Sequence, residues 1–318
     1  MSKILVAGGG GFIGGYLVKR LIANGNKVRC VDIKKKSDWH QISNFAENVE
    51  LNLELKENCE KAVLGCKQVF NLACNMGGMG FIENNKALCM LSVLVNTHLL
   101  MASKKANVEK FFFSSSACAY NINLQNKTSI EGLRETDAYP AMPEDGYGWE
   151  KLFSERMCRH FTEDYKIDTK VARFHNIFGP YGTYDGGREK APAAICRKIA
   201  LAKKNKHKSI EVWGDGQQTR SFLYIEDCID AILKLFGSEV NEPINIGSEE
   251  QVSINQMIDI VEKIADYKVE RNYQLDKPKG VRGRSSNNQL IEKKLKWKPK
   301  YSLKEGLELT YKWIESKI

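Results

Sequence analysis

Tyr147 and Lys151 lie four residues apart at the start of a predicted amphipathic helix, so their side chains share one face of it. A lysine ammonium beside a tyrosine favours the phenolate and lowers the pKa of the phenol. The pair is therefore predicted to act as a base toward a hydroxyl group. Ser116, which ends an earlier apolar run, offers a hydroxyl that can hold the same oxygen.

A glycine-rich turn near the N-terminus is typical of dinucleotide binding. Gly8, Gly11 and Gly14 stand at three-residue intervals between the apolar run Lys3–Ala7 and a helical pattern that stops at Asn24. Glycines permit a tight turn and the close approach of a pyrophosphate, which the helix N-terminus stabilises. The place of the turn between a predicted strand and a predicted helix is the one that the dinucleotide fingerprint requires, and it puts Phe12 and Ile13 beside the cofactor.

Asp32 ends the second predicted strand, where the same fingerprint has an acid that accepts hydrogen bonds from the ribose hydroxyls. An acid at this position favours NAD over NADP. Lys34–Lys36 follow closely and could instead receive a 2′-phosphate. We predict NAD as the cofactor.

Predicted strands and helices alternate through the first half of the chain. Such alternation implies parallel strand–helix–strand units and an α/β fold with a Rossmann-type doubly wound sheet. Asp32 and Ser116 then fall at the carboxyl ends of strands, where this fold places its chemistry. The predicted strands are Lys3–Ala7, Lys27–Val31, Val49–Leu53, Gln68–Leu72 and Lys110–Ser115, with helices at about Lys56–Leu64 and Lys86–Lys105 between them.

Composition excludes several classes of protein. Hydrophobic residues make up 42% and charged residues 27% of 318 residues, which is ordinary for a folded protein. The net charge of +9 comes with lysine clusters but no nucleic-acid motif, so no nucleic-acid partner is expected, and the field favours an anionic small substrate. The nine cysteines show no metal-ligand or disulfide spacing, which indicates no metal site and a reducing, cytoplasmic setting. We see no signal peptide and expect no apolar run that spans a membrane.

Together these motifs resemble the extended short-chain dehydrogenase/reductase family, and the resemblance covers almost the whole chain. It implies that Tyr147 and Lys151 also contact the NAD. One departure is Asn52-Leu53, where such proteins usually have Asp-Leu near the adenine, and Asn52 and Leu53 are still expected to contact it. Further matching pieces are Asn71–Ala73, Arg173–Pro180, Trp213–Gly216, Arg220–Phe222 and Asn245–Gly247.

Three segments are similar to the GDP-mannose 3,5-epimerases within that family. They are Asn75–Ile82, Cys118 where many relatives carry threonine, and Gly186–Ala194, while Val281–Arg284 adds two arginines suited to a diphosphate. The resemblance implies an isomerase that converts GDP-D-mannose to GDP-L-galactose and GDP-L-gulose. Tyr147 would deprotonate the sugar 4-hydroxyl while hydride passes to NAD⁺. The resulting 4-ketone acidifies the hydrogens at C3 and C5, and the same cofactor finally returns the hydride.

The resemblance also assigns roles to particular residues. Cys118 would be the base and Lys190 the acid that invert C5 and C3, and their ordinary pKa values of about 8.5 and 10.4 suit a thiolate–ammonium pair. His175 is expected to be a core residue and not a ligand. The implied catalytic residues are Ser116, Cys118, Tyr147, Lys151 and Lys190. The implied substrate contacts are Gly78, Ser116, Asn176, Glu189, Lys190, Lys198, Gln217 and Arg282, with Lys198 and Arg282 on phosphate.

The same resemblance bears on domains and assembly. It implies an NAD-binding domain of residues 1–175 plus about 219–249 and a smaller C-terminal α/β substrate domain of about 176–218 plus 250–318. Ser253–Ala265, capped by Ser253, and Leu303–Ile314 are predicted helices of the smaller domain. The helices near Lys86–Lys105 and Tyr147–Tyr165 resemble those of a two-fold dimer interface, so a homodimer is expected.

Alternatives remain open from the sequence. A 3,5- or 5-epimerase of another GDP-linked sugar, such as a GDP-heptose, would need the same residues. A UDP-sugar 4-epimerase does not need Cys118 and Lys190, and a 4,6-dehydratase would normally want a carboxylate pair next to the serine, where Ala117-Cys118 stands. A non-catalytic NAD-binding regulator is a different class of protein, and the intact Ser116, Tyr147 and Lys151 argue against it.

Overall fold

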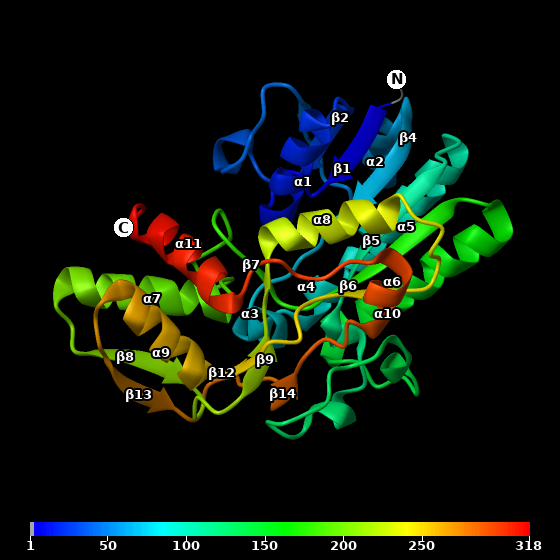
Figure 1. The fold of residues 1–318 in the computed structure, drawn as a ribbon. Coiled ribbons are helices and arrows are strands. Elements are labelled where there is room, and N and C mark those ends of the chain that lie inside the picture. The colour runs from blue at the N-terminus through cyan, green and yellow to red at the C-terminus, as the bar shows by residue number, and fades with distance from the viewer. Residues whose placement is uncertain (1–2) are drawn as a thin grey trace.

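A seven-stranded parallel sheet occupies the centre of the computed structural model, which describes residues 3–318 (Figure 1). The strand order is β11-β6-β5-β4-β1-β2-β3, so the direction of winding reverses at β1. This reversal opens a crevice at the carboxyl ends of the strands. The predicted doubly wound fold is confirmed. The strands are β1 (Lys3–Ala7), β2 (Lys27–Asp32), β3 (Glu47–Glu50), β4 (Cys66–Asn71), β5 (Lys110–Ser116), β6 (Asp168–Phe174) and β11 (Ile244–Ile246).

Helices cover both faces of this sheet. α1 (Phe12–Ala23) and α8 (Ile225–Phe236) pack on one face, and α2 (Lys56–Val63), α5 (Ser92–Lys105) and α6 (Asp145–Tyr165) pack on the other. Side chains of a strand point alternately to the two faces. In β5, Phe112 accordingly belongs to the core under α1 and α8, whereas Phe111 and Phe113 belong to the core under α2, α5 and α6.

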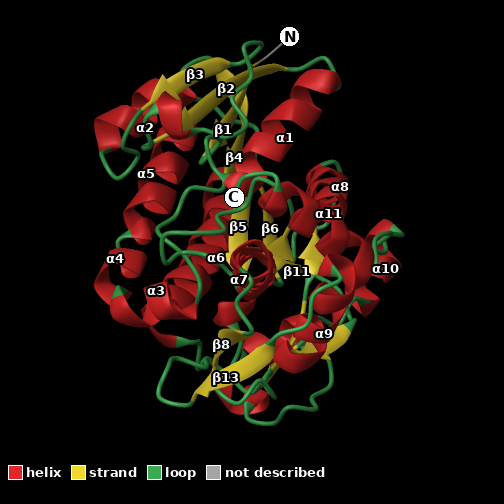
Figure 2. Cartoon of the chain, turned by 90° about the vertical axis from the view of Figure 1, so that its left-hand side faces the viewer, coloured by secondary structure: helices red, strands yellow, loops and turns green. Residues whose placement is uncertain are grey.

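A smaller lobe is built mainly from the second half of the chain (Figures 1 and 2). Its helices α7 (Ala191–Asn205), α9 (Ile254–Ala265) and α11 (Leu303–Glu315) pack on one another. The predicted capping of α9 is confirmed, because the Ser253 hydroxyl accepts the Gln256 N–H while the Gln256 side chain accepts the Ser253 N–H. The strands of the lobe pair as β8 (Ser209–Trp213) with β13 (Glu270–Gln274), β7 (Ile177–Phe178) with β10 (Leu223–Tyr224), and β9 (Thr219–Ser221) with both β12 (Gln251–Ser253) and β14 (Gly283–Arg284).

The remaining elements are short helices beside the carboxyl ends of the strands or at the surface. They are α3 (Met79–Asn84), α4 (Lys86–Met90), α10 (Gln289–Leu295), and the 3₁₀ turns η1 (Lys36–Asp38), η2 (Ala117–Ala119), η3 (Ile122–Gln125) and η4 (Glu135–Ala138). The η2 turn follows β5 directly, so the chain turns immediately after Ser116.

One strand begins and ends earlier than the sequence predicts. The apolar run suggests Val49–Leu53, but β3 is Glu47–Glu50. Within residues 3–318, β3 is an edge strand that pairs only with β2, and the last pair of that ladder is Asp32 with Glu50. The chain then turns at Asn52, whose side-chain oxygen accepts the Glu54 N–H at 2.9 Å. The early turn leaves Asn52 and Leu53 in a loop above the sheet.

The segment Lys86–Lys105 is long and apolar enough, by length and composition alone, to cross a membrane. The prediction that the chain has no such segment was therefore wrong. Its most apolar window has a mean hydropathy of 1.4, and 44% of that window is buried inside the protein. The segment is divided at Leu91 into α4 and α5, which pack against α6. One side of it is thus core, and the other side is exposed.

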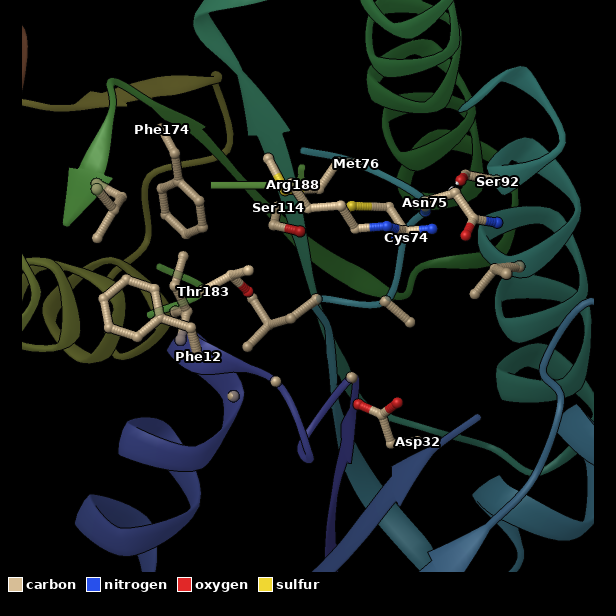
Figure 3. Close-up of a pocket in the computed structure, with 18 of the residues that line it drawn as sticks. Phe12, Asp32, Cys74, Asn75, Met76, Ser92, Ser114, Phe174, Thr183 and Arg188 are labelled. Carbon is tan, nitrogen blue, oxygen red and sulfur yellow. Dashed lines mark hydrogen bonds between the residues drawn. The ribbon is translucent and has the colours of Figure 1, made fainter. Parts of the chain in front are cut away.

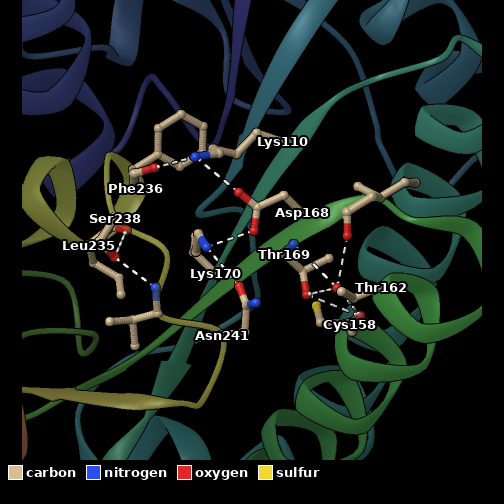
Figure 4. A network of polar contacts seen from close by, with 12 residues as sticks. Lys110, Cys158, Thr162, Asp168, Thr169, Lys170, Leu235, Phe236, Ser238 and Asn241 are labelled. Carbon is tan, nitrogen blue, oxygen red and sulfur yellow. Dashed lines mark hydrogen bonds and ion pairs between the residues drawn. The ribbon is translucent and has the colours of Figure 1, made fainter. Parts of the chain in front are cut away.

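A polar network lies at the opposite end of β6 from the catalytic candidates (Figure 4). The Lys170 ammonium is buried, pairs with Asp168 at 2.6 Å and donates to Asn241 at 2.7 Å. Lys110 pairs with the same carboxylate at 2.9 Å and donates to the carbonyl of Phe236, the last residue of α8, at 3.0 Å. Because every charged group here has a partner, the network serves to tie α8 and the loop after it to the sheet.

Candidate active site

A cavity of about 400 Å³ opens at the carboxyl ends of the central strands (Figure 3). The glycine turn borders it closely. A Cβ at Gly14 would lie 2.1 Å from the Gly8 carbonyl oxygen, and Gly8 itself has φ +79°, so both positions require glycine. The predicted cofactor residues Gly8, Gly11, Phe12, Ile13, Gly14, Asp32, Asn52, Leu53 and Tyr147 all line this cavity. Lys151 does not line it and is buried behind Tyr147.

The polar groups at the end of β2 fit a dinucleotide that has no 2′-phosphate on its ribose. One oxygen of the buried Asp32 carboxylate accepts the Lys34 N–H at 3.0 Å, and Figure 3 shows the carboxylate directed toward the cavity. The Lys34 ammonium donates to the Gly10 carbonyl at 2.8 Å. That ammonium is thus bound to the glycine turn, and Asp32 remains as an acceptor for ribose hydroxyls.

Tyr147 and Lys151 share one face of α6, as their spacing predicts. The Lys151 ammonium lies 5.4 Å from the centre of the Tyr147 ring and 3.3 Å from Oε2 of Glu150. The expected lowering of the Tyr147 pKa is wrong for the protein alone. Burial raises the pKa of Tyr147 well above its usual value, and the charges at Cys74, Cys118 and Glu150 raise it further, whereas the Ser116 hydroxyl lowers it.

Cys118 follows Ser116 in the η2 turn, and its N–H donates to Oγ of Ser116 at 3.1 Å. Cys118 is 7% exposed and does not line the cavity, and burial raises the pKa of its thiol to about 11. Lys190 lines the cavity as the residue that caps α7. Burial lowers the pKa of Lys190, and the charge at Cys118 opposes this shift. Burial thus favours the neutral form of both groups, contrary to the thiolate–ammonium pair that ordinary pKa values suggest.

Gly78 meets the segment that carries Lys190 and thereby fixes its path. The Gly78 N–H donates to the Arg188 carbonyl at 3.1 Å, and a Cβ at Gly78 would lie 2.4 Å from the Glu189 carbonyl oxygen. The Arg188 guanidinium lies 4.0 Å from the centre of the Phe81 ring and lines the cavity. Residues 75–82 and 186–190, which are distant in the sequence, are therefore in direct contact beside the cavity.

Several of the other predicted substrate contacts do not line the cavity. The Asn176 amide donates to the Ser221 carbonyl at 2.9 Å, and the Lys198 ammonium donates to the Glu211 carbonyl at 2.8 Å, so both have partners within the protein. The side chain of Gln217 is exposed to solvent, whereas its neighbour Gln218 is buried. Glu189 differs from them, because its Oε2 is buried and accepts no hydrogen bond within residues 3–318.

The two arginines predicted to form one diphosphate patch point to different partners. Arg282 pairs with Asp215 at 3.0 Å, whereas Arg284 is buried and donates to Sγ of Cys118 at 3.4 Å. Arg220, also buried, donates to the Thr219 carbonyl at 2.7 Å. Burial lowers the pKa of Arg220 to about 10, and the charge at Arg284 adds to the effect. The sequence analysis named Arg284 only as part of this patch and Arg220 only within a matching segment, so it predicted neither the contact of Arg284 with Cys118 nor the burial of Arg220.

His175 is a core residue, as predicted. It is fully buried, and its Nε2 lies 2.9 Å from Oδ1 of Asn245. Burial lowers its pKa to about 3, so the imidazole is neutral near neutrality. No group of three or more His, Cys, Asp or Glu side chains suited to a metal ion occurs within residues 3–318, and the nine cysteines there are all free thiols.

Comparison with known proteins adds independent findings. The model of the NAD dependent epimerase/dehydratase family matches residues 4–247. The chain belongs to this family. Its membership of the NAD dependent epimerase/dehydratase family confirms the predictions of NAD as the cofactor and of an enzyme of the epimerase type, an isomerase.

Relatives within the NAD dependent epimerase/dehydratase family cover nearly the whole chain. It is 43% identical over 317 residues to GDP-mannose 3,5-epimerase 1 of Oryza sativa subsp. japonica and to GDP-mannose 3,5-epimerase of Arabidopsis thaliana. These alignments cover 99% of this chain and 82% and 83% of the two relatives. The UDP-glucose 4-epimerase of Thermotoga maritima has a similar structure, with a TM-score of 0.89, 27% identity and 99% of each chain covered.

Proposed function

We propose that this chain is a GDP-mannose 3,5-epimerase, which converts GDP-D-mannose to GDP-L-galactose and GDP-L-gulose. The observation that carries the proposal is the convergence of Cys118 and Lys190 on the site of Ser116 and Tyr147. Cys118 packs with Tyr147 in one buried cluster, its N–H donates to Oγ of Ser116, and Ser116, Tyr147 and Lys190 line one cavity. A thiol and an amine beside an oxidising centre are what inversion next to a transient ketone requires. The relatives named GDP-mannose 3,5-epimerase support the same choice of reaction.

The residues of the glycine turn, Asp32 and Asn52 would hold NAD, which supplies the acceptor and donor of the C4 hydride when bound. Tyr147 takes the proton of the sugar 4-hydroxyl, and Ser116 holds that oxygen through its own hydroxyl. Lys151, beside the Tyr147 ring, supports the phenolate with its positive charge. The hydrogens at C3 and C5 become acidic once C4 is a ketone.

Cys118 removes a proton from one side of the sugar ring, and Lys190 gives a proton from the other side. Burial lowers the pKa of Lys190, which makes its ammonium a more effective proton donor near neutrality. Burial works against the Cys118 thiolate, so the cation of Arg284 beside the sulfur is needed to support it. Acid–base help of this kind contributes about 10² to 10⁴ in rate.

A surplus of positive charge supports a nucleoside diphosphate as the carrier of the sugar. Arg220 and Arg284 are buried, Arg282 is half-buried, and the nearby carboxylates are Glu144, which pairs with Arg284, and Asp215, which pairs with Arg282. Among the described residues 3–318, the Arg220 guanidinium donates only to the carbonyl oxygens of Thr219 and Lys279. A buried guanidinium without a carboxylate is suited to a phosphate oxygen, which it can bind through two N–H groups.

Proton NMR of the purified protein with GDP-mannose in D₂O tests the proposal directly. Deuterium at C5 and C3, with new signals of galactose or gulose type, is the expected result. GDP-mannose that keeps its protons while NAD is bound would rule out this substrate. The same experiment with a GDP-heptose and with UDP-glucose then separates another GDP-sugar epimerase from a 4-epimerase. No turnover of any nucleotide sugar would favour the non-catalytic NAD-binding regulator.

We further propose that the protein is a homodimer whose interface is the exposed apolar side of α4, α5 and α6. Leu88, Met90 and Leu91 on the α4–α5 segment are at least one-third exposed, as are Trp149 and Phe153 on α6. Exposed apolar clusters of this kind are typical of protein interfaces. Analytical ultracentrifugation of the wild type and of Phe153→Lys is the test, and a wild type that sediments as a monomer at micromolar concentration would contradict the dimer.

We retain two further proposals from the sequence. The division into an NAD-binding domain of residues 1–175 plus about 219–249 and a substrate domain of about 176–218 plus 250–318 is supported by β11, which pairs with β6 in the central sheet. Limited proteolysis with and without NAD would test it. A cytoplasmic location is supported by the nine free thiols, and fluorescence microscopy of a tagged chain would test it.

A further inference from the structure

Three hydrogen bonds fix the buried guanidinium of Arg284. Its Nη1 donates to Sγ of Cys118 at 3.4 Å, its Nη2 pairs with Oε2 of Glu144 at 2.7 Å, and its Nε donates to Oε1 of Gln125 at 2.6 Å. Arg284 is 4% exposed and Glu144 is 9% exposed. A planar guanidinium held on two sides in this way keeps its third side turned to the sulfur.

Glu144 is also joined to Cys118 through the backbone. Its N–H donates to the Cys118 carbonyl at 2.9 Å, immediately before α6 begins at Asp145. A Cβ at Gly148, one turn further along, would lie 2.3 Å from the same carbonyl oxygen. The first turn of α6 therefore packs directly on Cys118, and the carboxylate, the guanidinium and the sulfur form one rigid group.

We propose that Glu144 is a positioning residue that holds Arg284 against the Cys118 sulfur, offsets part of its positive charge, and so sets the strength of Cys118 as a base. The inference rests on the proposed function, in which Cys118 removes the protons at C3 and C5. The Glu144 carboxylate contacts Arg284 and the Cys118 side chain, so it acts on the reaction through these two groups.

The charges around the sulfur agree with this role. Burial raises the pKa of Cys118 to about 11, the Glu144 carboxylate adds to this effect, and the Arg284 guanidinium opposes it. Glu144 is ionised, because the guanidinium of Arg284 outweighs the effect of burial and lowers its pKa. Two other cationic groups whose electrostatic environment includes Cys118 are Lys190, which caps α7, and Arg220 on β9. Tyr147 on α6 also faces it.

Glu144→Gln removes the negative charge and keeps an oxygen that can accept the N–H of Arg284. The Cys118 thiolate is titrated by absorbance near 240 nm in the NAD-loaded enzyme, and the matching Cys118→Ser protein is subtracted in each background. We expect the midpoint of the thiolate titration to fall by about one pH unit in Glu144→Gln, the effect of losing a nearby like charge. An unchanged or higher midpoint would overturn the proposal. This readout needs no substrate, so it is independent of whether GDP-mannose is turned over.

Two further variants test whether a change of the thiolate midpoint is specific to the charges beside Cys118. Arg284→Gln removes the cation and is expected to raise the midpoint, and a lower midpoint there would also overturn the proposal. Glu83→Gln on α3 is the matched control, since this carboxylate lies near Glu144 but outside the contacts of Arg284, and it should leave the midpoint where it is. If Glu144→Gln does not fold, the thiolate midpoint of Arg284→Gln is compared with that of the wild type, and a lower midpoint overturns the proposal.

The exchange reaction supplies the functional readout. The rate of deuterium incorporation at C5 of GDP-mannose, followed by NMR against pH, should show an acid limb that moves to lower pH in Glu144→Gln by the same amount as the thiolate midpoint. An acid limb that stays in place while the thiolate midpoint moves would show that Glu144 does not set the base of this reaction. Absence of exchange in both proteins, with a shifted thiolate midpoint, would overturn the substrate and not the role of Glu144.

Discussion

The amide of Gly78 donates a hydrogen bond to the carbonyl of Arg188 at 3.1 Å, which joins two segments that are far apart in the sequence. The segment of Arg188 continues into Glu189 and Lys190, and Lys190 caps α7. The position of the proposed acid is therefore determined by a residue without a side chain.

Gly78→Ala tests this relationship. The added Cβ would lie 2.4 Å from the Glu189 carbonyl oxygen, a contact that backbone atoms cannot relieve without moving. Displacement of Lys190 by about 1 Å is expected to lower kcat by about a hundredfold. NAD affinity, measured by calorimetry, should change less than kcat, because Gly78 itself does not line the cavity. Gly237→Ala, at the end of α8 with room for a methyl group, is the control. Full activity of Gly78→Ala would show that the contact does not position Lys190.

Cys118→Ser removes the thiol and keeps a side chain of similar size. We expect exchange of the C3 and C5 hydrogens with D₂O to fall by about 10² to 10⁴, while NAD binding is retained. NMR measures the exchange and calorimetry the binding. Cys66→Ser, a buried thiol at the start of β4, should leave both unchanged. Normal turnover of Cys118→Ser would exclude this residue as the base, and loss of exchange at both carbons in Lys190→Ala alone would reverse the two roles.

Tyr147→Phe removes the group that deprotonates the 4-hydroxyl. No hydride should then leave C4, so the absorbance of NADH near 340 nm should not rise on addition of substrate and no epimer should form. The ring still fills its place over Lys151, so the fold should be retained. A near-normal yield of epimer from this variant would contradict the transient oxidation.

Asp32→Ala tests the ribose contact. Loss of hydrogen bonds to a charged acceptor should weaken NAD binding by about ten- to a hundredfold in calorimetry. Asp38→Ala, an exposed acid in η1 a few residues later, should have no effect. Equal NAD affinity of Asp32→Ala and the wild type would remove Asp32 from the cofactor site.

The pH dependence of folding should reflect His175. Burial lowers the pKa of His175 from 6.5 to about 3 in the folded protein, so protonation favours the unfolded chain. The stabilising contribution is complete above pH 6.5 and is lost as the pH falls toward 3, at up to about 1.4 kcal/mol per pH unit. Urea unfolding of the wild type and His175→Gln across this range measures it. The variant should lose less stability on acidification, whereas the exposed His40→Gln should follow the wild type. Parallel curves for His175→Gln and the wild type would contradict the assignment.

Local sequence patterns correctly predicted the first strand, the turn and helix that follow it, and the shared helix face of two candidate catalytic residues. The bounds of β1 match the apolar run Lys3–Ala7, because strand, turn and helix signals follow one another there. The spacing of Tyr147 and Lys151 likewise placed them on one helix face. β3 was displaced because its end depends on pairing with β2, which sequence periodicity does not record.

Contacts between residues that are far apart in the sequence could not be predicted from local sequence patterns. Arg284 and Cys118 are 166 positions apart, and Arg284 and Glu144 are 140 apart. No spacing rule joins such positions, so Glu144 gave no signal at all. The expected pKa of Tyr147 was wrong for a related reason, since burial decides its direction and depends on everything packed around the ring.

The segment that bears Lys190 also forms part of the wall of the cavity bordered by the glycine turn. Thr183, Arg188 and Lys190 all contribute to that wall, and the intervening Gly186 and Gly187 have positive φ and open space where a side chain would begin. Because one segment both walls the cavity and carries Lys190, a displacement of it would change the border of the cofactor cavity and the position of the proposed proton donor together.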